Sequence, residues 1–105
     1  MRLTAADRHA IETSAREAFP PGTKVILFGS RVDDARRGGD IDLLIEPACA
    51  LAADDLVARR SRFIARLYRL LEEQRIDVVV AGASAGGESP VVQAARRDGI
   101  ELART

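Results

Sequence analysis

Three acidic residues with apolar, strand-like flanks are the part of this sequence best suited to chemistry. Asp40 and Asp42 lie two positions apart in the segment DIDLLI, and Asp77 lies in the later segment IDVVVA. Side chains alternate between the faces of a strand, so Asp40 and Asp42 are predicted on one face with Cα atoms about 6.6 Å apart. Asp77 joins them if its strand lies beside that of Asp42. Three converging carboxylates repel one another, and a folded protein tolerates this mainly when cations occupy the site.

The ligand chemistry of these acids predicts a particular class of metal. Oxygen ligands without histidine or cysteine favour Mg²⁺, or alternatively Mn²⁺, over Zn²⁺. Two such ions about 3.5–4 Å apart can hold a triphosphate and activate an attacking oxygen. We therefore predict that Asp40, Asp42 and Asp77 are metal ligands and catalytic residues. The alternative, ordinary acids solvated or paired with arginine, is disfavoured because aspartate is uncommon in strands.

A Gly-Ser turn precedes the acidic segment. Gly29, Ser30 and Arg31 directly follow the apolar segment TKVILF. A strand that runs into Gly-Ser at the start of a helix leaves outward-pointing backbone N–H groups, which bind anions. Gly29 allows close approach of phosphates, Ser30 adds a hydroxyl donor, and Arg31 can neutralise phosphate charge. A phosphate site beside a carboxylate cluster predicts nucleotidyl transfer, with attack on an α-phosphate and release of pyrophosphate.

Alternating helices and strands must position these residues. We predict helices over residues 4–18, 54–71 and 89–98, and a short helix from the Gly-Ser turn to about residue 35. Strands are predicted over residues 23–28, 40–45 and 76–81, with a short edge strand over 100–103. This order predicts an α/β fold. The apolar residues at helical spacing in the long helix are Leu56, Phe63, Ile64, Leu67, Leu70 and Leu71.

Composition excludes several classes of protein. The chain has 105 residues, which is one domain's worth of sequence. Sixteen Lys+Arg balance sixteen Asp+Glu, so strong nucleic-acid binding driven by overall charge is not expected. The single cysteine, Cys49, rules out an intrachain disulfide. We expect no membrane span and no signal peptide, and therefore a cytoplasmic protein.

The acids and the turn also carry a family resemblance. Gly29-Ser30, nine residues, Asp40-x-Asp42 and a later strand acid at Asp77 resemble the DNA polymerase β-like nucleotidyltransferase superfamily. The specific parts are FGSR and GDIDLLIE. The small size is similar to that of the minimal nucleotidyltransferases, usually encoded beside a HEPN-domain protein as a toxin–antitoxin pair. The resemblance covers roughly residues 19–105 and implies one minimal nucleotidyltransferase domain over 1–105, with a small mixed sheet of three to four strands flanked by helices.

The resemblance also implies roles for single residues. Gly29 and Ser30 would bind the triphosphate, Asp40 and Asp42 would bind both Mg²⁺ ions, and Asp77 would bind the catalytic ion and serve the attacking hydroxyl. Members of this group transfer AMP from ATP to a tyrosine of the HEPN toxin, which implies an AMPylating antitoxin in a hetero-oligomer with its toxin. The sequence departs from the pattern where VDD follows GSR and where glycine, rather than serine, precedes the first acid.

Two other functions remain open at this point. The chain is alternatively a binding module that neutralises its partner by docking and keeps only a relic of the active site. A subunit that modifies an antibiotic or RNA is a weaker alternative.

Four arginines at helical spacing are either a basic surface for RNA or an acidic partner, or a solvated face with ion pairs within the helix. We favour the solvated face for these residues, which are Arg59, Arg62, Arg66 and Arg69.

Overall fold

The computed structural model describes residues 3–29, 40–71, 75–81 and 89–105. In this part of the chain, helices and strands follow in the order α1, β1, β2, α2, β3, α3 and β4. The helices are α1 (Ala5–Ala18), α2 (Ala53–Leu70) and α3 (Pro90–Asp98). The strands are β1 (Lys24–Phe28), β2 (Ile41–Glu46), β3 (Ile76–Val80) and β4 (Ile100–Arg104). The short helix predicted after the Gly-Ser turn lies outside the described residues.

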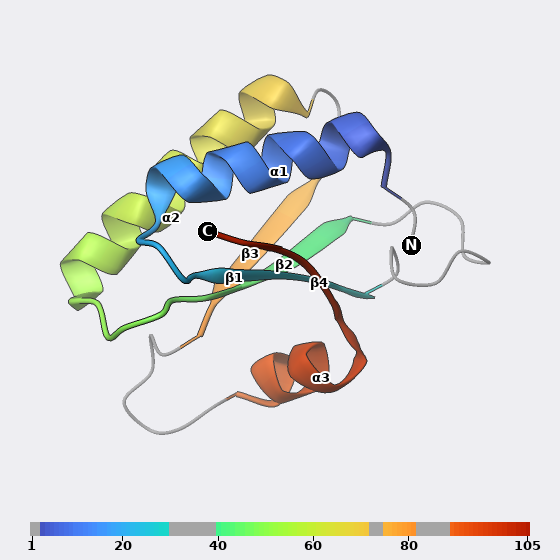
Figure 1. Cartoon of the computed structure of the whole chain (residues 1–105). Helices are drawn as coiled ribbons and strands as arrows, with labels where there is room; N and C mark the ends of the chain where they lie inside the picture. The colour runs from blue at the N-terminus through green and yellow to red at the C-terminus, as the bar shows by residue number, and fades with distance from the viewer. Residues whose placement is uncertain (1–2, 30–39, 72–74, 82–88) are drawn as a thin grey trace.

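The strands form one mixed sheet in the order β3-β2-β1-β4. Strand β1 is antiparallel to both β2 and β4, whereas β2 and β3 are parallel. Helices α1 and α2 lie on one face of the sheet and α3 lies on the other (Figure 1). The predicted α/β fold with a small mixed sheet is confirmed, and the predicted edge strand is β4.

The side chains of β2 alternate between the main core and the opposite face of the sheet. Ile41, Leu43 and Ile45 are fully buried in the core beneath α1 and α2, as predicted. The intervening residues Asp42 and Leu44 therefore face the side that carries α3. Leu44 belongs to a smaller apolar cluster with residues of α3. Helix α3 covers the middle of this face with apolar contacts, and Asp42 lies beyond them.

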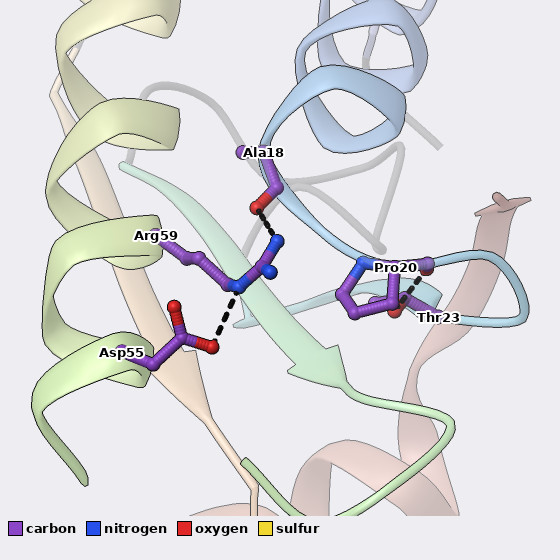
Figure 2. Close-up of polar contacts among 5 residues, drawn as sticks. All are labelled: Ala18, Pro20, Thr23, Asp55 and Arg59. Carbon is purple, nitrogen blue, oxygen red and sulfur yellow. Dashed lines mark hydrogen bonds and ion pairs between the residues drawn. The ribbon is translucent and has the colours of Figure 1, made fainter. Parts of the chain in front are cut away.

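An arginine of α2 joins the two helices that cover the core. Arg59 donates from Nη1 to the carbonyl oxygen of Ala18 at 3.0 Å and from Nε to Asp55 Oδ2 at 2.9 Å (Figure 2). Ala18 is the last residue of α1, and its carbonyl has no partner within the helix. The guanidinium therefore caps the negative end of α1, which stabilises the helix terminus.

The turn between α1 and β1 is tied to the C-terminal strand. The Thr23 hydroxyl donates to the Pro20 carbonyl at 2.8 Å (Figure 2). The backbone N–H of Gly22 donates to the Thr105 carbonyl at 2.7 Å, and that of Thr105 donates to the Thr23 carbonyl at 2.9 Å. These bonds fix the start of β1, and β1 in turn sets the position of Gly29 at its other end.

Two details differ from the sequence predictions. Leu70 is 49% exposed rather than part of the core. It borders a groove between α1 and α2 whose α1 side is lined by Ala6, His9, Ala10 and Thr13. Strand β2 begins at Ile41, so Asp40 lies just before the strand rather than within it. In the described parts of the chain, no helix has the length and apolar character needed to cross a membrane.

Candidate active site

The predicted partnership between Asp42 and Asp77 is present in the sheet. The two residues are paired in the register of the parallel strands β2 and β3. Both side chains lie on the face opposite the α1/α2 core, because the flanking Ile41 and Ile76 are buried in that core. Neighbouring strands are about 4.8 Å apart, so the two carboxylates lie close together. Asp42 is half-buried and Asp77 is exposed, so the pair opens to solvent on one side.

The surroundings of Asp42 disfavour the charged form of its carboxyl. Burial raises the pKa of the Asp42 carboxyl above its ordinary value, and the negative charges of Asp77 and Asp40 raise it further. A hydrogen bond with Asp77 adds to this effect. All of these causes favour the neutral form of Asp42 over the carboxylate. A bound cation would remove the repulsion and restore the charged form, as expected for a metal site.

Because Gly29 has no side chain, the Asp42 carboxylate can lie directly beside its backbone. Its backbone has a φ of +77°, in the left-handed region that favours glycine. A Cβ atom at this position would lie 2.2 Å from Oδ2 of Asp42. Phe28, the residue before Gly29, pairs with Asp42 in the antiparallel register of β1 and β2. The sequence suggested Gly29 for close approach of phosphate, and the tertiary structure gives a second reason for glycine, which is room for the carboxylate.

Of the remaining predicted site residues, the structure describes only Asp40. Asp40 is partly buried just before β2 and is close enough to raise the pKa of Asp42. Ser30 and Arg31 fall outside the described residues, so their predicted contacts with a triphosphate stay predictions. Among the residues that the structure describes, no three histidine, cysteine, aspartate or glutamate side chains are arranged to hold a metal ion together. The full three-carboxylate ligand set also stays a prediction.

The donor atoms present fit a hard divalent cation. Asp42 and Asp77 offer carboxylate oxygens side by side, which are the ligands that Mg²⁺ and Mn²⁺ prefer. Burial and the two neighbouring carboxylates, which raise the pKa of Asp42, are effects that a bound cation would offset. Mg²⁺ usually keeps several waters and takes one or two carboxylates together with substrate phosphates, so a pair that opens to solvent suits it.

Solved structures share this fold. A chain from the crystal structure of a mutant MntA–HpeT toxin–antitoxin pair aligns with a TM-score of 0.69 and 20% identity, over 93% of this chain and 73% of that one. A chain from the complex of tri-AMPylated HEPN toxin of Shewanella oneidensis with MNT antitoxin aligns with a TM-score of 0.65 and 21% identity, over 94% and 71%. The fold is that of these toxin–antitoxin structures. No protein-family model and no curated protein matches the chain.

The arginines of α2 have different contacts in the structure. Arg59 caps α1, and Arg66 forms an ion pair with Glu17 of α1. Arg62 and Arg69 are exposed. The favoured prediction of a solvated face with ion pairs therefore holds for part of the set, and two of its arginines connect the helices that cover the core.

Sequence reasoning missed the link between α2 and the strand that carries Asp77. The Tyr68 hydroxyl lies 3.4 Å from both the backbone nitrogen and the carbonyl oxygen of Ile76. Arg60 donates from Nε to the Val78 carbonyl at 3.1 Å. These contacts hold β3 on either side of Asp77. A tyrosine and an arginine on a helix carry no signal in the sequence that would assign them to a sheet edge.

Proposed function

We propose that this protein is a Mg²⁺-dependent minimal nucleotidyltransferase that transfers AMP from ATP to a HEPN toxin and so acts as its antitoxin. The observation that carries the proposal is the pairing of Asp42 with Asp77 across β2 and β3, with Gly29 making room for the Asp42 carboxylate. Carboxylates crowded on an open face of a sheet destabilise a fold unless they serve a cation.

The structural neighbours support the reaction class. One neighbour contains a HEPN toxin that carries three AMP groups, bound to its MNT antitoxin. The other carries changes of two aspartates, two positions apart, to glutamate. The same spacing separates Asp40 from Asp42 here. A toxin–antitoxin fold, this spacing and the carboxylate pair together favour protein AMPylation over other nucleotidyl transfers.

The roles proposed for the residues follow from their positions. Asp42, whose pKa is raised by burial and by the negative charges of Asp77 and Asp40, would hold Mg²⁺ together with one or both of these residues. The bound ion would stabilise the charge that develops on the phosphate oxygens during transfer. Ser30 and Arg31 are proposed to contact the triphosphate. Mn²⁺ is expected to substitute for Mg²⁺ because both accept the same oxygen ligands.

The proposed transfer joins the hydroxyl oxygen of the acceptor to the α-phosphorus of ATP. The bond from that phosphorus to the oxygen bridging to the β-phosphate breaks, and pyrophosphate leaves with the bonding electrons. The exposed Asp77 carboxylate can accept the hydroxyl proton, because it lies on the open side of the pair where an acceptor can approach.

Intact mass spectrometry tests this function. The HEPN-domain product of the neighbouring gene is incubated with this protein, Mg²⁺ and each nucleoside triphosphate in turn. We expect a mass gain of one or more AMP groups with ATP, and none with Asp42→Asn or Asp77→Asn. The matched control is Asp54→Asn, which changes an exposed aspartate in the first turn of α2.

The same experiment separates the proposal from docking alone. A gain that survives Asp42→Asn and Asp77→Asn would remove the carboxylate pair from the reaction. No gain with any triphosphate, although the two proteins form a stable complex and the toxin is silenced, would make the chain a docking module with a relic site.

A further inference from the structure

Strand β3, which carries Asp77, lies at one edge of the described sheet. The carbonyl of Arg75, the residue before β3, accepts the N–H of Ile41 in β2 at 2.9 Å. Backbone groups alternate in direction along a strand, so the N–H and C=O groups of Asp77 also face β2. Those of Ile76 and Val78, directly before and after Asp77, therefore point away from the sheet.

Two side chains of α2 bond to these outward groups. The Tyr68 hydroxyl lies 3.4 Å from both the nitrogen and the carbonyl oxygen of Ile76, so it accepts from one and donates to the other. Arg60 donates from Nε to the Val78 carbonyl at 3.1 Å. Both residues lie four positions from Ile64, which packs against the core, so the three share the side of α2 that faces β3.

The carboxylate pair places a load on this edge strand. Asp42 and Asp77 are in register across β2 and β3, and like charges at this distance repel one another. In the part of the chain that the structure describes, β3 has a neighbouring strand on one side only. A strand paired on one side opens locally at a lower free-energy cost than a central strand. The bonds from α2 oppose such opening on either side of Asp77.

The position of the Asp77 carboxylate depends on the backbone that carries it. Asp77 is exposed, so packing around its side chain does not fix it. The side chains of Ile76 and Val78 are buried in the core beneath α2, and α2 also bonds to the backbone of the same two residues. The helix therefore holds, from the core side, the segment whose opposite face carries the carboxylate.

We propose that Arg60 and Tyr68 are positioning residues for the cation site, which hold the backbone of β3 so that the Asp77 carboxylate stays beside Asp42. They act through the strand, because α2 and the carboxylate pair lie on opposite faces of the sheet (Figure 1). This inference rests on the proposed function for the divalent cation. Loss of the two bonds should let the carboxylates separate and should weaken cation binding.

Mn²⁺ binding to this protein alone, with the free ion measured by electron paramagnetic resonance, tests the positioning role. Arg60→Met/Tyr68→Phe is expected to bind Mn²⁺ about tenfold more weakly, the lower end of the range for changes that disturb the orientation of metal ligands. The lost positive charge of Arg60 would by itself strengthen cation binding, so weaker binding reports the loss of position. Arg60→Lys keeps a charged donor and should retain most of the affinity of the wild type.

Arg59→Met and Thr23→Val are matched controls for stability and charge. The Arg59 guanidinium donates to the Ala18 carbonyl at 3.0 Å, and the Thr23 hydroxyl donates to the Pro20 carbonyl at 2.8 Å. Each control therefore loses a comparable bond to a carbonyl outside β3, and Arg59→Met also loses a positive charge. Both should unfold more easily than the wild type and should bind Mn²⁺ with unchanged affinity.

Amide hydrogen exchange gives a second readout that needs no cation. The N–H groups of Asp77 and Val79 face β2, so their protection reports the pairing of β3 with β2. In Arg60→Met/Tyr68→Phe these two amides should exchange faster relative to the central strand β1, because β3 opens locally. In the two controls, any faster exchange should be shared by β3 and β1.

The outcomes separate positioning from other roles of the two side chains. Unchanged Mn²⁺ affinity in Arg60→Met/Tyr68→Phe would overturn the positioning role and leave a cap that only prevents β3 from pairing with another chain. Equal loss of affinity in the controls would also overturn it, because general stability would then control binding. If the wild type binds Mn²⁺ with the expected dependence on Arg60 and Tyr68 but transfers no nucleotide, the positioning role holds and the proposed function fails.

Discussion

Gly29→Ala is the sharpest test of how the carboxylate site is built. The backbone of Gly29 has a φ of +77°, and a side chain in this left-handed region costs about 1–2 kcal/mol. For a domain of this size, that loss lowers the unfolding temperature by about 5–15 °C. The added Cβ would also lie 2.2 Å from Oδ2 of Asp42, so the carboxylate must rotate away. Cation affinity then falls by about 10–100-fold, the range for changes that disturb ligand orientation.

Gly22→Ala is a matched control for the backbone term. Gly22 has a φ of +87°, and its Cβ would meet the Cβ of Ala48 at 2.9 Å, at a turn that does not contact Asp42. It should lose at least as much stability as Gly29→Ala, because neither contacting atom can rotate away. Its affinity for Mg²⁺, measured by calorimetric titration, should match that of the wild type.

Measuring both variants separates a loss of thermal stability from a loss of Mg²⁺ affinity. We expect similar or greater loss of thermal stability in Gly22→Ala, and loss of Mg²⁺ affinity in Gly29→Ala alone. Wild-type Mg²⁺ affinity in folded Gly29→Ala would refute the view that this glycine makes room for a metal-binding carboxylate. Equal loss of affinity in both variants would mean that stability, rather than the position of Asp42, controls binding.

Three further changes test the charge, the core and a helix cap. Because the pKa of Asp42 is raised, its ionisation opposes folding once pH rises above the value of the unfolded carboxyl. Metal-free Asp42→Asn should therefore unfold at a higher temperature than the wild type at pH 7, and the difference should close below about pH 4, as circular dichroism can show. Leu67→Ala should lower the free energy of unfolding in urea by about 2–5 kcal/mol, because Leu67 is fully buried. Leu70→Ala should lower it by less than about 1 kcal/mol, because Leu70 is half exposed. Equal losses in the two variants would contradict the exposure of Leu70. Ser89→Ala should cost about 1 kcal/mol, because the Ser89 hydroxyl accepts the first-turn N–H of Val92 at 3.3 Å, and Ser89→Asp should retain most of the stability.

Local sequence signals were sufficient to predict most of the helices and strands. The Thr4 hydroxyl accepts the N–H of Asp7 at 3.0 Å, and α1 ends before Pro20, as the cap and the proline predict. The Ser89-Pro90 start of α3 is also local chemistry. Alternation along DIDLLI was enough to separate Ile41 from Asp42, because the period of a strand is two wherever it pairs.

The exposure of single residues could not be predicted without knowing which elements pack beside them. Leu70 shares the helical spacing of the core leucines, yet it is half exposed at the border of a groove that Ala6, His9, Ala10 and Thr13 line on the α1 side. Arg59 and Arg62 share the spacing of one basic stripe, yet the first caps α1 and the second is exposed. The helical period predicts the direction in which a side chain points. Whether that side chain is buried, paired or exposed depends on the neighbouring element that packs against the helix.

By itself, the sequence determined the alternation of helices and strands, the face of β2 that carries Asp42, and the types of ligand available. Only the tertiary structure decided that β3 lies parallel to β2 with Asp77 beside Asp42, and that Gly29 lies against the Asp42 carboxylate. The physical reason is distance along the chain. Periodicity and capping act over a few residues, whereas the choice of strand neighbour depends on burying both faces of the whole sheet under its helices.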